Sequence, residues 1–327
     1  MMRAVVVEDF GSSDVLRVRA WPAPHPGPGE VRIRVSLASV NYADVLSRRG
    51  GYDAGRSVPF VPGLDCVGIV DAVGEGVEAS RVGQRVAAFA KSGSYAEFAL
   101  ASAVLTYPVP NDLPDEAVCG LTALVTAYNV LTLAGRSRKG ESVLVHAASG
   151  GVGGLAVQIA RALGASPVIG VTSGSKAAFV RGLGADVVVD RGAEDFAART
   201  LEATGGRGAD VILDSVGGET LERGVTCLAE FGRLVTFGQT GGRSANVGTS
   251  PLHRGSRAVV GYSSGHLRRV RPHAVGSAVD AAFELLRRGD VTPSVFERFA
   301  LERGPEAHAL MERAEHVGKL VLMPSAD

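Results

Sequence analysis

The pattern of hydrophobic and polar residues changes character about one third of the way along the chain. Up to about residue 120, short apolar runs such as Val31–Val40 and Arg85–Phe89 alternate with turns rich in glycine and proline. Short strands at this spacing predict an all-β, barrel-like unit. From about Asp115, apolar residues at helical spacing alternate with short apolar runs. Strands that alternate with helices predict a parallel, doubly wound sheet covered on both faces.

The second pattern begins with an expected helix over Glu116–Leu133. The parallel strands that we expect are Val143–His146, Pro167–Val171, Val187–Asp190, Val211–Asp214, Leu234–Phe237 and Ala258–Gly261. The expected helices are Val152–Leu163, Lys176–Leu183, Ala193–Thr204 and Thr220–Leu228. Near the end of the chain we expect a helix over His273–Arg288 and a last strand over Lys319–Met323.

A glycine-rich turn joins the first expected parallel strand to its helix. The turn reads Ala147-Ala148-Ser149-Gly150-Gly151-Val152-Gly153. Main-chain amides at such a helix start have no partner within the helix, and the helix dipole favours an anion there. Glycine also lets a pyrophosphate approach the main chain and lets the helix pack closely on the strand. Because a second strand follows the helix, the turn predicts dinucleotide binding.

Composition and charge exclude several other classes of protein. A chain of 327 residues is longer than one compact core usually holds, so we expect two domains. The 34 basic residues balance 34 acidic ones, which gives no bulk attraction to nucleic acid or to an anionic membrane. No apolar run is long enough to span a membrane. The scattered cysteines Cys66, Cys119 and Cys227 favour a reducing compartment, so we expect a cytoplasmic protein.

Three segments together carry a family resemblance. They are the glycine turn followed by Gln158 and Arg161, the segment Val40-Asn41-Tyr42-Ala43-Asp44 with Gly50 and Tyr52, and Pro62-Gly63-Leu64-Asp65-Cys66-Val67-Gly68. In order and spacing they resemble the quinone oxidoreductase (ζ-crystallin-like) branch of the medium-chain dehydrogenase/reductase superfamily. The resemblance runs from Met2 to about Pro324.

This resemblance implies a domain organisation. It implies a GroES-like catalytic domain over residues 1–120 and a Rossmann domain that binds NADPH over residues 121–264. Residues 265–327 would return to complete the catalytic domain. Relatives commonly form homodimers through the edge of the cofactor sheet, so we expect a homodimer here.

The same resemblance argues against a metal site. Zinc-dependent relatives carry Cys where this chain has Asn41, and His where it has Leu64. A structural zinc lobe would need four closely spaced cysteines, and residues 87–119 offer only Cys119. Without a metal's charge at a carbonyl oxygen, hydrogen-bond donors worth about 3 kcal/mol each must suffice. That favours acceptors already primed for hydride, namely quinones, enones, enals and α,β-unsaturated thioesters.

The residues after the second parallel strand predict the type of cofactor. NAD-specific folds usually place an acid about 20 residues after the glycine turn, where it binds the ribose 2′-hydroxyl. Here Thr172, Ser173 and Lys176 stand near that position, and no acid appears before Asp186. The resemblance implies that Lys176 contacts the 2′-phosphate of NADPH and that Arg191 supplies a further phosphate contact. We therefore expect NADPH rather than NADH.

The resemblance also assigns the reacting end. Asn41 and Tyr52 match the family's Asn…Asp…Gly-x-Tyr pattern and would line the pocket beside the nicotinamide, between the domains. The phenol of Tyr52, with an ordinary pKa near 10, is protonated at neutral pH and can donate a proton. Thr126 resembles a threonine that contacts the nicotinamide or the substrate oxygen.

Further positions complete the expected site. Ser215, Phe237 and Gly238 lie at the ends of strands, where open α/β sheets bind ligands and where relatives hold the cofactor. We expect Asp65 to be a structural acid and His146 to be a packed histidine.

Together these observations predict a metal-free, NADPH-dependent reductase of quinones or α,β-unsaturated carbonyl compounds. Several quinone-reducing relatives have a second pocket aromatic residue where this chain has Leu46, so the acceptor stays open. One alternative is an enoyl-thioester reductase, which a basic rim for a carrier phosphate would favour. The other is an NADPH-binding protein without turnover, against which the presence of Asn41 and Tyr52 argues.

Overall fold

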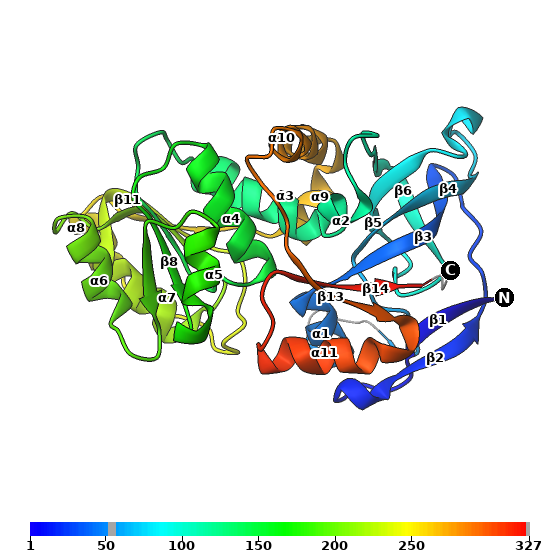
Figure 1. Cartoon of the computed structure of the whole chain (residues 1–327), viewed down its shortest axis with the longest axis horizontal. Coiled ribbons are helices and arrows are strands. Elements are labelled where there is room, and N and C mark those ends of the chain that lie inside the picture. The colour runs from blue at the N-terminus through cyan, green and yellow to red at the C-terminus, as the bar shows by residue number, and fades with distance from the viewer. Residues whose placement is uncertain (52–56, 325–327) are drawn as a thin grey trace. The chain divides into compact units, whose positions relative to one another are not determined.

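The computed structural model describes residues 1–51 and 57–324, and the chain divides into two compact units (Figure 1). The first unit comprises Met1–Ala123, Leu267–Phe283 and Pro293–Asp327, and the second comprises Leu124–His266 and Glu284–Thr292. Residues 284–292, which lie inside the expected returning segment, therefore group with the second unit.

A six-stranded sheet in the order β13-β14-β3-β4-β5-β6 forms the framework of the first unit. Its strands are β3 (Glu30–Val40), β4 (Asp65–Val73), β5 (Arg85–Ala90), β6 (Phe98–Pro108), β13 (Val295–Ala300) and β14 (Lys319–Met323). Because β3 pairs with both β4 and β6, the four strands β3 to β6 close on themselves. The GroES-like, barrel-like unit expected from the sequence is confirmed.

Alternation along the strands explains where the core of the first unit lies. In β3 the side chains of Val31, Ile33 and Val35 are buried, whereas Arg32 and Arg34 between them face outward. A separate antiparallel pair, β1 (Met2–Val7) and β2 (Leu16–Trp21), adds apolar side chains to the same core. Helix α11 (Gly304–Arg313) packs against α1 (Tyr42–Arg48) and β14.

The second unit contains a parallel sheet in the order β12-β11-β10-β7-β8-β9. Its strands are β7 (Val143–Val145), β8 (Val168–Thr172), β9 (Val187–Asp190), β10 (Ala209–Asp214), β11 (Leu228–Thr236) and β12 (Ala258–Gly261). The helices between them are α4 (Gly151–Ala162), α5 (Ala177–Gly182), α6 (Phe196–Ala203), α7 (Gly218–Gly224) and α8 (Thr249–Arg254).

Right-handed crossovers determine where these helices lie. They place α4 and α5 on one face of the sheet and α6 and α7 on the other, as Figure 1 shows. The strand order reverses between β7 and β10, which is the switch point where open α/β sheets bind ligands. The doubly wound Rossmann sheet expected from the sequence is confirmed.

One predicted helix was wrong as a single element. The stretch expected as Glu116–Leu133 contains α2 (Asp115–Val118), then α3 (Leu121–Asn129), then a π-helical turn over Val130–Ala134. The break falls at Gly120, whose φ of +119° lies outside the helical region. Apolar periodicity continues across the break, so the pattern alone does not reveal it.

Near the end of the chain the helix expected at His273 begins with a 3₁₀ turn over Pro272–Val275 and continues as α10 (Gly276–Arg287). The sequence patterns also missed α1, α8, α9 (Ser264–Val270), α11 and β13. Within residues 1–51 and 57–324, no helix is both long and apolar enough to cross a membrane.

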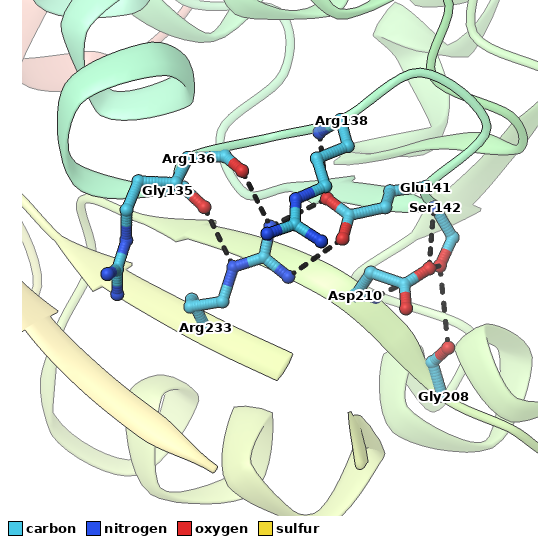
Figure 2. A network of polar contacts seen from close by, with 8 residues as sticks. All are labelled: Gly135, Arg136, Arg138, Glu141, Ser142, Gly208, Asp210 and Arg233. Carbon is cyan, nitrogen blue, oxygen red and sulfur yellow. Dashed lines mark hydrogen bonds and ion pairs between the residues drawn. The ribbon is translucent and has the colours of Figure 1, made fainter. Parts of the chain in front are cut away.

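A polar network fixes the N-terminal ends of the parallel strands (Figure 2). The guanidinium of Arg233 donates to Glu141 and to the carbonyl oxygens of Gly135 and Arg136, at 2.6, 2.8 and 3.1 Å. Beside it, Ser142 donates its hydroxyl and its main-chain N–H to one oxygen of Asp210. The glycine turn follows the C-terminal end of β7. This network therefore lies at the opposite ends of the strands from the glycine turn.

Candidate active site

The glycine turn begins directly after β7. Gly150 precedes the first residue of α4, its N–H donates to the carbonyl oxygen of Ala147 at 2.9 Å, and Ala147 has a φ of 52°. A Cβ on Gly153 would lie 2.8 Å from the carbonyl carbon of Ala147 and closer still to its oxygen. Only glycine fits there, so the start of α4 packs tightly on the turn, as dinucleotide folds require.

The end of β8 is tied to this turn. Buried Thr172 donates its hydroxyl to the hydroxyl of buried Ser149 at 2.9 Å. Ser173 follows, and its carbonyl oxygen accepts from the N–H of Lys176 at 2.9 Å. The N–H of Arg191 donates to the carbonyl oxygen of Thr172 at 2.8 Å. The structure therefore brings the hydroxyl groups and both expected cations to the adjacent ends of β8 and β9.

An acidic side chain also lies at the ends of these two strands. The carboxylate of Asp190 packs against Gly174 so closely that a side chain on Gly174 would overlap it. One of its oxygens accepts from the N–H of Gly192 at 2.9 Å. Asp190 ends β9, whereas NAD-binding acids end the second strand of the fold. Its carboxylate therefore lies at the carboxyl end of the third strand, where the sequence analysis weighed Arg191 but not this acid.

The ends of β10 and β11 also meet at this edge. The N–H of Phe237 donates to the carbonyl oxygen of Asp214 at 3.0 Å. A Cβ on Gly238 would lie 3.1 Å from the carbonyl oxygen of Ser215, so these two residues are neighbours. Thr126 is buried within α3, in the second unit.

His146 directly follows β7, and Asp214 ends the neighbouring strand β10. The imidazole of His146 packs edge-on against Phe196, with ring centroids 4.7 Å apart, and burial lowers its pKa to about 4. One oxygen of Asp214 accepts from the N–H groups of Val216 and Gly217, both at 2.7 Å. His146 is thus a packed, neutral histidine in this structure, and Asp214 holds the loop after β10.

In the first unit, Asn41 lies where β3 ends and α1 begins. Its extended main chain precedes the first turn of α1, and its N–H donates to Asp44 at 2.9 Å. The other oxygen of Asp44 accepts from the N–H of Gly63 at 3.2 Å, and the hydroxyl of Tyr95 donates to Asp44 at 3.1 Å. Burial, with Asp65 nearby, raises the pKa of Asp44 to about 7.

The side chain of Asn41 belongs to a group that we name the amide cluster, which consists of Ser39, Asn41, Asp65, Thr122 and Lys319. The amide nitrogen of Asn41 donates to Asp65 at 2.9 Å and to Ser39 at 3.0 Å. Its amide oxygen accepts from the ammonium of Lys319 at 2.9 Å. Asp65 also accepts from the hydroxyl of Ser39 and the N–H of Thr122. Each polar atom of the Asn41 amide is therefore held.

Lys319 is one of three members of the amide cluster that sequence reasoning missed, the others being Ser39 and Thr122. Lys319 is 4% exposed, and its ammonium also donates to the carbonyl oxygen of Val40 at 2.9 Å. Burial lowers its pKa, while the charge of Asp65 opposes that shift. The available signal was a single lysine at the start of the otherwise apolar strand Lys319–Met323.

Two expectations concern residues near this cluster. Tyr52 lies outside the described residues, so its role stays a prediction. Leu64 is half-buried beside Asp65, at the position where zinc-dependent relatives carry a histidine. Among residues 1–51 and 57–324, no group of three or more His, Cys, Asp or Glu side chains could hold a metal ion.

A barrel-like unit with a fixed amide cluster, and a Rossmann sheet with a glycine turn, define a two-unit protein of the dehydrogenase/reductase class. Residues 27–111 match the family model of the alcohol dehydrogenase GroES-like domain. Residues 151–289 match that of the zinc-binding dehydrogenase, a stretch that includes neither Asn41 nor Leu64.

Individual relatives agree over the whole chain. A quinone oxidoreductase of Pseudomonas aeruginosa is 34% identical, over 99% of this chain and 100% of its own length. The human synaptic vesicle membrane protein VAT-1 homolog is 30% identical, over 100% of this chain and 88% of its own. The structure of mycobacterial Rv1454c complexed with NADPH is similar with a TM-score of 0.91 and 36% identity, covering 99% of this chain and 100% of that one.

These comparisons bear out the resemblance in the sequence. The chain belongs to the quinone oxidoreductase family of the medium-chain dehydrogenase/reductase superfamily.

Proposed function

We propose that this protein is an NADPH-dependent reductase that transfers hydride to a quinone or an α,β-unsaturated carbonyl compound. The observation that carries the proposal is the side chain of Asn41, held by hydrogen bonds on both sides of its amide. It stands where zinc-dependent relatives carry a cysteine ligand. A fixed amide suits an acceptor that needs orientation and hydrogen bonding rather than a metal.

The residues at the edge of the parallel sheet fit NADPH. Three of the four residues of the turn Gly150–Gly153 are glycine, which lets a diphosphate approach the main chain closely. The 2′-phosphate would be held by the cations and hydroxyls that meet at the ends of β8 and β9, namely Thr172, Ser173, Lys176 and Arg191. Contacts along the rest of the cofactor would come from Thr126, Ser149, Ser215, Phe237 and Gly238. The solved complex of a 36% identical mycobacterial relative with NADPH supports this choice.

When bound, NADPH supplies the hydride. The chain itself provides Asn41 to orient the acceptor beside the nicotinamide, and Tyr52 or water to supply the proton. Reduction of an enone then consumes one hydride and one proton and gives the saturated carbonyl compound. Hydrogen bonds hold the Asn41 amide before the substrate binds, so no reorganisation is needed when negative charge develops on the acceptor oxygen.

The decisive experiment is a panel of acceptors measured with NADPH and with NADH. The panel contains benzoquinone, naphthoquinone, a medium-chain enal, a cyclic enone and crotonyl-CoA. We expect turnover of quinones or enones with NADPH and much weaker turnover with NADH. Turnover confined to crotonyl-CoA would instead establish the enoyl-thioester reductase. NADPH binding without turnover of any acceptor would establish a non-catalytic protein.

The substitution Tyr52→Phe tests the proton donor separately. It removes only the phenol hydroxyl, so the affinity for NADPH should not change. We expect kcat to fall at least tenfold for enones, whose product needs a proton on carbon. An unchanged kcat across the panel would assign the proton to water.

We further propose a homodimer, a catalytic domain of residues 1–120 with 265–327, and an NADPH-binding domain of residues 121–264. Strand β12 forms an edge of the parallel sheet, so its outer side is available for pairing with a second copy. Light scattering of the purified protein measures the mass directly.

We place the protein in the cytoplasm, because Cys66, Cys119 and Cys227 are all free and buried.

A further inference from the structure

We propose that Lys319 is a positioning residue for the proposed reduction, which acts by fixing the amide of Asn41. The inference rests on the proposed function, because Asn41 is the residue assigned to the acceptor. It goes beyond that function by giving a role to a buried cation from the last strand of the chain.

Strand pairing brings Lys319 to this place. Strand β14 runs antiparallel to β3, with Leu320 opposite Val40, so Lys319 is adjacent to the end of β3. From there its ammonium reaches the carbonyl oxygen of Val40 and the amide oxygen of Asn41, both at 2.9 Å. The two side chains lie 278 positions apart in the sequence. The contact therefore exists only in the folded first unit.

The packing around Lys319 shows a place made for a long side chain. A Cβ on Gly120 would lie 3.2 Å from Cε of Lys319, so glycine at this position leaves room for the lysine stem. The next residues of β14, Leu320 and Val321, are fully buried and apolar. Methionine would fill a similar volume without removing a charge from water. Packing alone therefore does not account for the ammonium.

The neighbours of the Lys319 ammonium indicate that it fixes the orientation of the Asn41 amide. An ammonium can only donate hydrogen bonds, and a carboxylate can only accept them. Lys319 and Asp65 therefore allow a single orientation of the Asn41 amide, with its oxygen toward Lys319 and its nitrogen toward Asp65. The opposite orientation would set N–H against N–H and oxygen against oxygen. The positive charge of the ammonium bound to the amide oxygen also polarises the amide, which makes the amide nitrogen a stronger hydrogen-bond donor.

The groups that face Lys319 determine how the contact between its ammonium and the Asn41 amide responds to pH. Asp65 of β4 and Asp44 of α1 favour its charged form, as does Cys119 before α3, while burial disfavours it. The net effect lowers the pKa of Lys319. As pH rises through that lowered pKa, the ammonium loses its proton, and the Asn41 amide loses its fixed partner. The rate should therefore fall on the alkaline side, and arginine at position 319 should remove that fall because it stays protonated.

The main test combines kinetics with a double-mutant cycle. Lys319→Met should lower kcat about 100-fold, a cost typical of a misplaced reacting group, with a much smaller change in KM. In the Asn41→Ala background the same substitution should have little further effect, because Lys319 acts through Asn41. Lys319→Arg should restore most of the activity and shift the alkaline limb of the pH profile upward. Lys91→Met is the matched control, because the side chain of Lys91 is 70% exposed and pairs with Glu30, away from the amide cluster.

A second readout separates this inference from the proposed function. In ¹⁵N-labelled protein, the side-chain amide signals of Asn41 are identified by their loss in Asn41→Ala. These signals should shift in Lys319→Met and should stay near their wild-type positions in Lys91→Met. In the wild type they should titrate with a pKa below that of an ordinary lysine. If the wild type turns over no acceptor, the proposed function fails. The amide signals then still test whether Lys319 fixes the side chain of Asn41.

Three results would overturn the inference. One is a kcat of Lys319→Met within twofold of the wild type. Another is a loss that multiplies fully with that of Asn41→Ala. The third is a set of Asn41 amide signals that responds neither to the substitution nor to alkaline pH. If Lys319→Met does not fold, two measurements still test the inference. They are the alkaline titration of the Asn41 amide signals in the wild type and the pH–rate profile of Lys319→Arg.

Discussion

The two polar centres of this protein are built from different parts of the chain. The amide cluster of the first unit consists mainly of side chains that hold one another, including a buried ammonium and a buried carboxylate. The glycine turn of the second unit is made of main chain, and its key feature is a missing side chain at Gly153. The first centre is thus sensitive to removal of a side chain, and the second to addition of one.

Asp65 should give the largest effect on the side-chain-built centre. Its carboxylate accepts hydrogen bonds from Ser39, Asn41 and Thr122. Asp65→Ala leaves these donors without their acceptor and the buried ammonium of Lys319 without its counter-charge, so unfolding should need about 3–5 kcal/mol less free energy. Urea denaturation of both proteins at neutral pH measures the difference. A loss below about 1 kcal/mol would mean that the cluster is not a stabilising unit.

His308 should make the stability of the first unit depend on pH, in the direction opposite to Asp44, whose raised pKa of about 7 adds stability as pH falls. The imidazole of His308 lies 3.2 Å from the hydroxyl of Tyr95, and burial lowers its pKa from 6.5 to about 3. Between these values the unfolded chain binds a proton that the folded chain does not, so stability falls as pH falls. For this group the loss between pH 7 and pH 4 is about 3 kcal/mol.

His308→Gln keeps a partner for Tyr95 and cannot titrate, so the comparison isolates the proton. The free energy of unfolding of the variant should fall less steeply with acid than that of the wild type. His146, whose pKa is lowered to about 4, acts in the same direction in the second unit and is unchanged in both proteins. Parallel curves for the two proteins would assign the acid sensitivity to other groups.

Gly153→Ala tests the main-chain centre. The added Cβ would overlap the carbonyl group of Ala147, so the start of α4 must move. We expect a loss of about 1–3 kcal/mol in stability, as for other overpacked sites, and loss of measurable NADPH binding. Gly182→Ala is the matched control, because a Cβ there would meet no atom of the described residues within 4 Å. Equal NADPH affinity in the two variants would contradict the role of the turn.

Lys176→Ala should have the smallest effect. The side chain stands at the edge of the sheet, where water and salt screen its charge. We expect affinity for NADPH to fall about tenfold, close to 1.4 kcal/mol, and affinity for NADH to stay unchanged. The difference should shrink at high salt. If both affinities change equally, Lys176 contacts a part of the cofactor other than the 2′-phosphate.

The same contrast explains what the sequence revealed. The glycine turn and the Asn41 segment are local, so their residues stand together in the sequence and could be found there. Lys319 contacts Asn41 across 278 positions, and His308 contacts Tyr95 across 213. No local pattern encodes such a contact, because it depends on how distant strands pair.

Two errors in the predicted elements have a related cause. The break falls at Gly120, whose φ is +119° and whose neighbour is the side chain of Lys319 from β14, which local periodicity does not contain. Helix α1 followed β3 without a glycine or proline between them, and the signal that was overlooked was Asn41 with Asp44 three positions later. The fold class was predictable because it depends on the order of elements rather than on these details.

The central claim is that this protein moves hydride from NADPH to a conjugated acceptor without a metal. The most direct measurement follows turnover of a cyclic enone with NADPH that carries deuterium at both positions of its reactive carbon, in protein treated with a chelator and assayed for bound zinc. We predict undiminished turnover, less than one tenth of an equivalent of zinc, and one deuterium on the β-carbon of the product. Activity that appears only when zinc is added back, or a product without deuterium, would contradict the claim.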